Sequence, residues 1–394
     1  MSGKGRTVGT RAVHGDREPA PGPLIPPVVQ SATFVMASSA EMRRYLEGDD
    51  ELYLYTRYAN PTVRVLEEHL AALEEGEAAL AFASGMAAAT TGILSLLEPG
   101  DEVLASASLY GGTARFVRDI LPRFGFRGRV IPVPDLVKVA SLAGERTRAI
   151  VLESPTNPMV EVVDLAAVAE AAHGRGITVF VDNTFASPVV QQPLKLGADL
   201  VMHSLSKALG GHSDIIGGAL VGSQARIDKA HALLKVLGGC IDPHTAFLVE
   251  RGLKTVHLRV QRQCENAMAL ATRLEKHPKI RRVVYPGLAS HPAHAVARRQ
   301  MSAFGGGVAF VLAGGLPAAE KFYDGLQLVS RAASLGGVES LISLPVHTSH
   351  YGFSEAQLRE AGIDPGAARI SLGVEDAADI IADVERALQS VPGA

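Results

Sequence analysis

Short apolar runs alternate with amphipathic stretches through the middle of the chain. Helical patterns at residues 64–75 and 86–97 are interleaved with strand-like runs at 78–82 and 102–105. The alternation continues to about residue 239 and is typical of βαβ units, in which each helix crosses back over the sheet. It predicts an α/β fold built on a mostly parallel sheet.

The pattern changes near residue 242. A long helical pattern over residues 246–275 precedes two strand candidates at 280–285 and 308–312, and a final helix is expected at 377–388. Because helices and strands are no longer strictly interleaved here, this region is expected to form a smaller α+β domain.

The first fifty residues contain a cluster of prolines instead of a periodic pattern. Proline fixes φ and lacks a backbone N–H, so the cluster predicts an extended arm without regular helix, of the kind that wraps a neighbouring molecule. The prolines concerned are Pro19, Pro21, Pro23, Pro26 and Pro27. The expected organisation is an arm (1–52), a large domain (53–245) and a small C-terminal domain (246–394).

Composition excludes several classes of function. The chain has 394 residues and is 47% hydrophobic, enough for a large core. Its 38 basic residues balance 41 acidic ones without a basic, aromatic-rich patch, so no nucleic-acid partner is expected. No apolar run has a membrane-spanning length and no signal peptide is evident, which predicts a cytoplasmic protein. Cys240 and Cys264 suggest neither a disulfide scaffold nor a metal site.

Lys207 lies in the segment HSLSKALGGHSD (203–214), directly after an apolar strand-like run. An amine that condenses with an aldehyde must lose its proton near neutral pH, and the hydroxyls of Ser204 and Ser206 suit a phosphate better than a packed core. A solvated surface charge is the alternative for any single lysine. Together these residues indicate pyridoxal phosphate, an aldehyde that also carries a phosphate.

Asp182 follows the run ITVFV (177–181), which predicts a short buried strand. An acid at the carboxyl end of a parallel strand points into the ligand crevice of an open α/β sheet. An ionised Asp182 there would keep a pyridine nitrogen protonated, and the protonated ring accepts electrons. A helix N-cap is the alternative for an isolated Asp, but its position one strand before Lys207 favours the cofactor role.

The chain resembles the pyridoxal-phosphate enzymes of cysteine and methionine metabolism from about residue 10 to residue 388. Besides the segments around Asp182 and Lys207, the motifs that carry the resemblance are YTRYANPT (55–62), ASGMA (83–87), LYGGT (109–113), ESPTNP (153–158), SLGG (334–337) and RIS (369–371). The resemblance implies the fold-type I, aminotransferase-like architecture, with a mostly parallel seven-stranded sheet between helices and a smaller C-terminal domain.

The phosphate of the cofactor is expected at the turn formed by Ser84, Gly85 and Met86. This turn follows a strand and opens a helix, so its N–H groups and the helix dipole suit an anion, although plain helix capping is the alternative. Ser204 and Ser206 would add hydroxyls. By resemblance, Tyr55 and Arg57 reach the phosphate of a neighbouring subunit, which implies a homotetramer (a dimer of dimers) with shared sites.

The remaining roles also follow from the resemblance. Tyr110 would stack on the cofactor ring and act as an acid or base, Asn157 would bind the ring oxygen, and Thr184 belongs to the cofactor-binding segment. Asn157, Ser334, Leu335 and Arg369 would bind the substrate, with the guanidinium fork of Arg369 holding its α-carboxylate. Lys207, Tyr110 and Asp182 are the expected catalytic residues.

The resemblance predicts chemistry at Cγ of an amino-acid substrate. The favoured function is γ-elimination on methionine or homocysteine, which releases a thiol, 2-oxobutyrate and ammonia. The alternatives are γ-replacement by an O-acylhomoserine sulfhydrylase or cystathionine γ-synthase, cystathionine γ-lyase activity, and a catalytically silent cofactor-binding regulator. Elimination and replacement share their early steps, so the motifs leave that choice open.

Three positions depart from the patterns of the specialised relatives. Enzymes that make or split cystathionine usually carry a glutamate directly before SLGG, where this chain has Ala333. Methionine γ-lyases typically have a cysteine after Tyr-Gly, where this chain has Gly112. His347, in the unusual segment LPVHTSH (344–350), has either a structural role or an effect on the distal part of the substrate pocket.

Overall fold

The computed structural model describes residues 5–17, 21–349, 351–352, 354, 356, 358 and 362–391. Of the residues discussed above, Pro19 and His350 lie outside this part of the chain.

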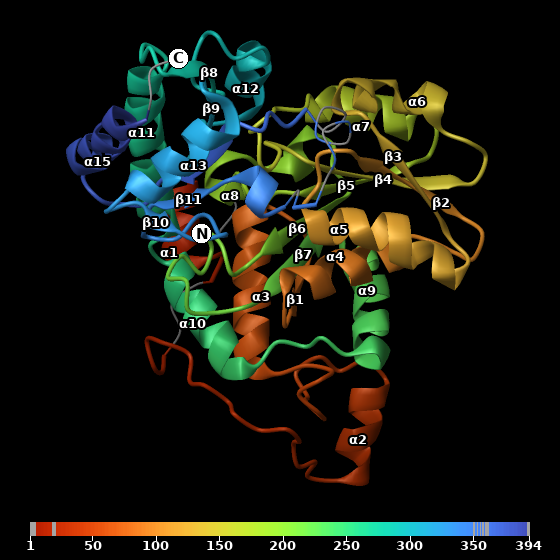
Figure 1. The fold of residues 1–394 in the computed structure, drawn as a ribbon. Coiled ribbons are helices and arrows are strands. Elements are labelled where there is room, and N and C mark those ends of the chain that lie inside the picture. Colours follow the sequence, from red (N-terminus) through yellow and green to blue (C-terminus); the bar gives the residue numbers. More distant parts are fainter. Residues whose placement is uncertain are drawn as a thin grey trace.

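The large domain is organised around a seven-stranded sheet with the order β1-β7-β6-β5-β4-β2-β3 (Figure 1). Strand β7 runs antiparallel to its two neighbours, and the other neighbouring pairs are parallel. The predicted mostly parallel, seven-stranded sheet is therefore confirmed. Its strands are β1 (Ala78–Phe82), β2 (Glu102–Ser106), β3 (Arg127–Ile131), β4 (Thr147–Glu153), β5 (Thr178–Asp182), β6 (Leu200–Ser204) and β7 (Gly218–Gly222).

Helices cover both faces of this sheet because successive strand residues point to opposite sides. In β1, Ala79 and Ala81 belong to the core shared with helix α3 (Pro61–Glu74), whereas Leu80 and Phe82 belong to the core shared with α4 (Gly85–Leu94) and α9 (Gln224–Leu237). The other helices around the sheet are α5 (Gly111–Arg115), α6 (Val139–Leu142), α7 (Leu165–His173), α8 (Ser187–Val190) and α10 (Pro243–Leu253). Short irregular helices span Phe116–Ile120, Leu121–Phe124, Val133–Lys138 and Pro193–Leu196.

The smaller domain contains a five-stranded sheet with the order β10-β11-β12-β9-β8. The rings of Phe310 and Phe322 meet edge to face at 5.6 Å in its core. Its strands are β8 (Ile280–Val284), β9 (Gly307–Leu312), β10 (Ser330–Arg331), β11 (Leu341–Ser343) and β12 (Ala367–Ser371). Its helices are α11 (Val256–Leu274), α12 (His294–Gln300), α13 (Gly315–Gly325) and α15 (Ala377–Ser390), with a 3₁₀ turn at Pro345–His347.

The expectation of an arm without helix is wrong outside the proline cluster. Helix α1 (Val8–His14) packs against α3 and α11 and buries Ala12 completely. Helix α2 (Ser39–Leu46) begins where the hydroxyl of Ser38 accepts a hydrogen bond from the N–H of Glu41. The prolines lie between these two helices, so they prevent helix only locally.

The long helix expected over residues 246–275 is also wrong, because two helices, α10 and α11, occupy it. The carbonyl of Gly252, near the end of α10, accepts hydrogen bonds from the guanidinium of Arg259 and the hydroxyl of Thr255. Side chains thus satisfy a backbone carbonyl near the end of α10, where the helical hydrogen bonds stop. The hydrophobic periodicity of the sequence does not reveal this break.

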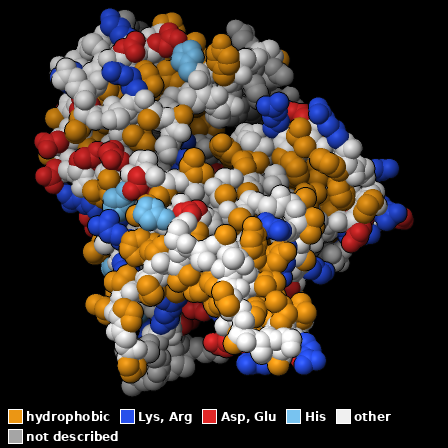
Figure 2. All heavy atoms as spheres, turned by 90° about the horizontal axis from the view of Figure 1, so that it is seen from below, with side chains coloured by type: hydrophobic (Ala, Val, Ile, Leu, Met, Phe, Trp, Pro, Cys, Tyr) orange, Lys and Arg blue, Asp and Glu red, His pale blue; other side chains and the backbone are white. Residues whose placement is uncertain are grey.

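Residues 21–58, which include α2, and the end of α9 lie at the lower end of the molecule in Figure 1. Figure 2 views the molecule from that side and shows hydrophobic side chains spread over much of the face. The large hydrophobic side chains exposed on these segments are Leu24, Ile25, Val28, Val35, Leu46, Tyr55, Val236 and Leu237. An exposed apolar surface of this kind is typical of an interface between subunits.

None of the helices within the described ranges combines the length and the apolar character needed to cross a membrane.

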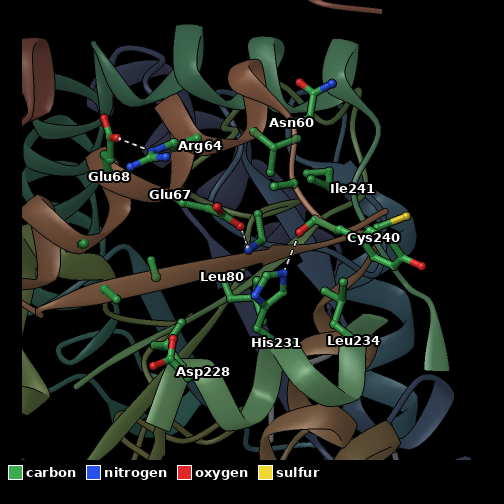
Figure 3. A pocket seen from close by; sticks show the side chains of 18 of the residues that line it. Asn60, Arg64, Glu67, Glu68, Leu80, Asp228, His231, Leu234, Cys240 and Ile241 are labelled. Atoms are coloured by element: carbon green, nitrogen blue, oxygen red, sulfur yellow. Dashed lines mark hydrogen bonds and ion pairs between the residues drawn. The ribbon is translucent and has the colours of Figure 1, made fainter. Parts of the chain in front are cut away.

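A cavity of about 340 Å³ lies beneath the arm, between α3, β1 and α9 (Figure 3). The carboxyl of Glu67 points toward β1 and accepts a hydrogen bond from the N–H of Ala81 at 2.8 Å. Opposite it, the imidazole of His231 contacts the carbonyl of Tyr58 at 2.6 Å. Burial raises the pKa of Glu67 to about 8, against the opposing hydrogen bond from Ala81.

Glu67→Gln should therefore stabilise the protein in a pH-dependent way. Because the pKa of Glu67 rises on folding from 4.5 to about 8, its contribution to stability is present below 4.5 and is lost as pH rises toward 8. The variant should gain about 1 kcal/mol or more relative to wild type between pH 5 and pH 8. Thermal or urea unfolding at several pH values measures this gain. Glu145→Gln, at an exposed position outside the cavity, is the matched control, and an equal gain in both variants would contradict the prediction.

Candidate active site

Three strands of the large sheet end side by side at one edge, at Glu153 of β4, Asp182 of β5 and Ser204 of β6. Glu153 and Asp182 are direct neighbours in the register of the two parallel strands. Lys207 follows three residues after the end of β6. This edge is where ligands bind in open α/β sheets.

Lys207 lies within a cluster of predicted site residues. Its Nζ donates a hydrogen bond to Oγ of Ser334 at 2.8 Å. Arg369 on β12 donates to the carbonyl of Ser334 at 2.8 Å and to Oδ1 of Asn157. Burial, and then the nearby charge of Arg369, lowers the pKa of Lys207, which favours the neutral amine. Strands of both domains thus surround a lysine suited to reaction with an aldehyde.

Arg369 is 5% exposed, and burial lowers its pKa to about 10, so it stays charged at neutral pH. Its Nε is buried and has no hydrogen-bond partner within the described part of the chain. A buried guanidinium with a free N–H requires an acceptor. A carboxylate of a bound substrate fits this requirement.

Asp182 is also held in place. Its Oδ1 accepts a hydrogen bond from the N–H of Thr184 at 3.0 Å, and the hydroxyl of Thr184 accepts one from the N–H of Ser204 at 2.8 Å. Burial raises the pKa of Asp182, while the hydrogen bonds from Thr184 and the charge of His203 oppose the rise. A cationic partner, such as a pyridinium nitrogen, would favour the ionised form further.

The predicted phosphate site lies at the N-terminus of α4. The hydroxyl of Ser84 accepts a hydrogen bond from the N–H of Ala87, so the helix-capping alternative is also correct. The N–H groups of Gly85 and Met86 make no hydrogen bond with any residue that the structure describes. A Cβ on Gly85 would lie 3.0 Å from Cβ of Ser204, which shows how closely the turn and the end of β6 approach. Free donors at a helix N-terminus suit a phosphate.

Ser206 makes a local contact, since its hydroxyl accepts a hydrogen bond from the N–H of Gly217 at 3.1 Å. This bond leaves the hydroxyl proton free to donate.

Tyr110 stands at the rim of the site with half of its surface exposed. Its N–H donates to Oε2 of Glu153 at 3.1 Å, which fixes the backbone of the loop. Gly112 lies within this loop, and a Cβ there would lie 2.7 Å from both the sulfur of Met86 and the ring of Tyr110. Those two side chains occupy the space that a cysteine at residue 112 would need.

Tyr55 and Arg57, two of the predicted site residues, are not part of this cluster. Arg57 stacks on the rings of Tyr55 and Tyr58 and donates to the carbonyl of Lys235 at the end of α9. Within the single chain, the structure gives Tyr55 and Arg57 no contact with Lys207.

Leu335 and His347 complete the set of predicted positions. Leu335 lines a small cavity with Phe185 and Ala208, next to Lys207. His347 pairs with Glu320 of α13 at 2.8 Å, and both side chains are half exposed. This surface contact favours the structural interpretation of His347 over a place in the substrate pocket.

The residues present fit a phosphorylated pyridine aldehyde. A lysine with a lowered pKa, a buried carboxylate, free N–H groups at a helix N-terminus and an unsatisfied buried guanidinium all lie at one edge of the sheet.

A comparison with protein families agrees with this geometry, since residues 9–389 match the model of the Cys/Met metabolism PLP-dependent enzymes. The chain belongs to this family. Its cofactor is pyridoxal phosphate, and it is an enzyme of the trans-sulfuration group, which disfavours the catalytically silent alternative.

Several relatives of this family are similar along nearly their whole length. The L-methionine gamma-lyase of Pseudomonas putida is 44% identical over 97% of each chain. The cystathionine gamma-synthase of Mycobacterium tuberculosis is 42% identical over 96% of each chain. Among solved structures, metB from Corynebacterium glutamicum superposes with a TM-score of 0.91 at 38% identity, covering 99% of each chain. The cystathionine gamma-lyase of Lactobacillus plantarum complexed with L-serine has a TM-score of 0.90 at 36% identity, covering 98% of this chain and 99% of the other.

Three buried residues at this edge were given no role by the sequence. Glu153 contacts the Tyr110 loop, and His203 pairs with Glu74. Burial and the neighbouring Asp182 raise the pKa of Glu153 well above its usual value, which favours its neutral form. Glu153 and His203 stand within strand patterns that end at the site, which was an available signal. Glu74 is 129 residues away from His203 in the sequence, and no sequence pattern pointed to its role.

Gly218→Ala should weaken cofactor binding. A Cβ at residue 218 would lie 2.2 Å from the carbonyl oxygen of Ser84, so the phosphate turn would have to move. Overpacking of this kind costs about 1–3 kcal/mol, which corresponds to about a 5- to 150-fold loss of affinity when the strain falls on the phosphate turn. Titration of the apoenzyme with pyridoxal phosphate measures it. Gly144→Ala, whose Cβ meets only Thr147 at 3.9 Å, should bind normally, and unchanged affinity in Gly218→Ala would contradict the prediction.

Proposed function

We propose that this enzyme catalyses γ-elimination on a sulfur amino acid, methionine or homocysteine, and releases a thiol, 2-oxobutyrate and ammonia. The observation that carries the proposal is the cluster of Lys207, Ser334, Arg369 and Asn157, which couples a lysine of lowered pKa to a buried carboxylate-binding arginine. The similarity to the L-methionine gamma-lyase of Pseudomonas putida supports this choice of reaction.

Lys207 is proposed as the base and proton carrier. Its neutral amine takes the proton from Cα of the substrate, releases that proton, and in its neutral form takes one from Cβ. The hydroxyl of Ser334, 2.8 Å from Nζ, orients the amine between these two transfers. When bound, the cofactor supplies the aldehyde for the amines and the ring that accepts electrons released at Cα.

The other side chains orient the reactants. Asp182 would hold the ring nitrogen, and Arg369 would bind the α-carboxylate, with its guanidinium fixed by Asn157 and the carbonyl of Ser334. Tyr110 would stack on the ring and donate a proton to the leaving sulfur. Ser84, Gly85, Met86, Thr184, Ser204 and Ser206 are the proposed remaining cofactor contacts.

Substrate preference is proposed to follow from Ala333. This residue is exposed and directly precedes Ser334, so it stands at the entrance to the lysine site without offering a charge. The distal ammonium of cystathionine would have no carboxylate partner at this position, whereas the apolar end of methionine needs none.

A γ-replacement reaction is the second candidate, favoured by the similarity to the cystathionine gamma-synthase of Mycobacterium tuberculosis. The crowding around Gly112 is consistent with it, because the chain lacks the cysteine typical of methionine γ-lyases at that position.

A homotetramer, a dimer of dimers, is proposed as the active assembly. Tyr55 and Arg57 stand apart from Lys207 of their own chain, close to exposed Val236 and Leu237 at the end of α9. A neighbouring subunit that covers this apolar face would bring Tyr55 and Arg57 to its own phosphate site.

The domain boundaries at 52/53 and 245/246 are part of the proposal, although the second falls within α10 (Pro243–Leu253), and a cytoplasmic location is proposed as well. The location is supported by Cys240 and Cys264, which are both free thiols, as expected in a reducing compartment.

Product analysis of the holoenzyme tests the function. Methionine and homocysteine should give 2-oxobutyrate rapidly, and cystathionine slowly. O-acetylhomoserine with sulfide should give little homocysteine. Homocysteine as the main product, with slow 2-oxobutyrate release from every substrate, would overturn elimination in favour of replacement. Lys207→Ala serves as the control and should be inactive with all substrates.

Ala333→Glu should shift the preference toward cystathionine. The new carboxylate can pair with the distal ammonium, and a partly exposed ion pair contributes about 1 kcal/mol, or roughly fivefold in relative kcat/KM. Ala333→Gln has the same length without the charge and should change the ratio little. Equal ratios in both variants would show that charge at this position does not select the substrate.

A further inference from the structure

A buried polar cluster next to the Asp182 segment consists of Glu74, Asn183 and His203. Nε2 of His203 on β6 contacts Oε1 of Glu74 at 2.5 Å, and each side chain is 1% exposed. The same oxygen accepts a hydrogen bond from the amide of Asn183 at 2.8 Å. Asn183 directly follows Asp182, so one carboxylate contacts both the imidazole and the side chain of the residue next to Asp182.

An ionised Glu74 needs a cation at this place. It is the last residue of α3, where the helix dipole disfavours a negative charge. Its other oxygen, Oε2, is buried without a partner, and no lysine or arginine within the described ranges pairs with it. Because a buried carboxylate is costly unless it is paired, an imidazolium at His203 is the available source of positive charge.

His203 lies on the strand next to Asp182. Strands β5 and β6 are neighbours, and Asp182 pairs in register with Met202, so His203 stands one residue farther along β6 with its side chain on the opposite face of the sheet. The positive charge of His203 lowers the pKa of Asp182, after the larger effects of burial, which raises it, and of Thr184. On its other side, β7 places the uncharged Ala219 opposite His203.

Two further charged groups, Glu153 and Arg369, belong to the same site. Glu153 on β4 is its register neighbour and carries a raised pKa of its own, caused by burial and then by Asp182. Arg369 on β12 acts on both Glu153 and Lys207. None of these groups hydrogen-bonds to Asp182 in the part of the chain described, where the contact is made by Thr184.

We propose that Glu74 and His203 form a buried ion pair that keeps Asp182 ionised, and thereby strengthens the binding of the pyridine nitrogen of the cofactor. Negative and positive charges then alternate from Glu74 through His203 and Asp182 to the ring. Glu74 and His203 are positioning residues, since neither touches the cofactor. The inference rests on the role proposed above for Asp182.

The test is the affinity of apoenzyme for pyridoxal phosphate between pH 5 and pH 9. His203→Gln and Glu74→Gln should each lose affinity at a pH about one unit higher than wild type, because removing a nearby opposite charge shifts a titration by about that much. Near the wild-type midpoint this corresponds to about tenfold weaker binding.

The chain offers a matched control in a second buried pair, His69 with Glu250, whose atoms Nδ1 and Oε2 are 2.7 Å apart. Glu250→Gln removes an equivalent charge away from Asp182 and should leave the pH dependence as in wild type. If the variants at residues 74 and 203 also retain the wild-type pH dependence, or if Glu250→Gln shifts it equally, the inference is overturned.

Asp182→Asn separates the inference from the role on which it rests. If Asp182→Asn abolishes the pH dependence while His203→Gln and Glu74→Gln behave as wild type, only the inference fails. If Asp182→Asn binds the cofactor as wild type does at every pH, the role of Asp182 fails as well.

A second measurement needs no variant and covers the case in which the substitutions prevent folding. Neutron diffraction from crystals of the wild-type holoenzyme at pH 7 should show deuterium on both Nδ1 and Nε2 of His203. Deuterium on only one nitrogen would mean a neutral imidazole and would overturn the ion pair.

Discussion

Charged groups buried at the carboxyl edge of the large sheet must be compensated by one another, and the arrangement of the site depends on this requirement. Glu153, Asp182 and His203 end or nearly end three neighbouring strands, and Arg369 approaches them from the smaller domain. In a site of low exposure each charge is costly unless an opposite charge or hydrogen-bond donor is near. The unsatisfied donors that remain, Nε of Arg369 and the N–H groups of the α4 turn, are the groups that a cofactor and a substrate would satisfy.

The same requirement connects the two domains. Ser334 accepts a hydrogen bond from Lys207 of the large domain and, through its carbonyl, one from Arg369 of the small domain. Gly336, two residues later, approaches the backbone of Ala208, where a Cβ would lie 2.6 Å from its nitrogen, at a positive φ of 74°. The segment 334–337 therefore needs glycine to place its serine beside the lysine. A shift between the domains would alter the surroundings of the amine as well as the substrate site.

The proposed choice between elimination and replacement depends on groups at the rim rather than on this charged centre. Gly112 leaves room for Met86 and Tyr110, and Ala333 leaves the entrance without a carboxylate. Neither residue makes a hydrogen bond to Asp182 or Lys207 within the described part of the chain. Relatives named for different reactions are accordingly similar to this chain over nearly its full length.

The sequence by itself determined the sheet, the family and the cofactor, because these depend on local patterns. Residues 78–82 form a strand as predicted, since a short continuous apolar run is encoded within a few positions. Lys207 and Asp182 could be identified because each follows its own strand, and parallel strands end at the same edge. The break between α10 and α11 and the helix at Ser39–Leu46 were missed, because packing and side-chain hydrogen bonds override periodicity there. Only the tertiary structure brought Glu74 to His203, 129 residues apart, since pairing of buried charges depends on distances that no local pattern contains.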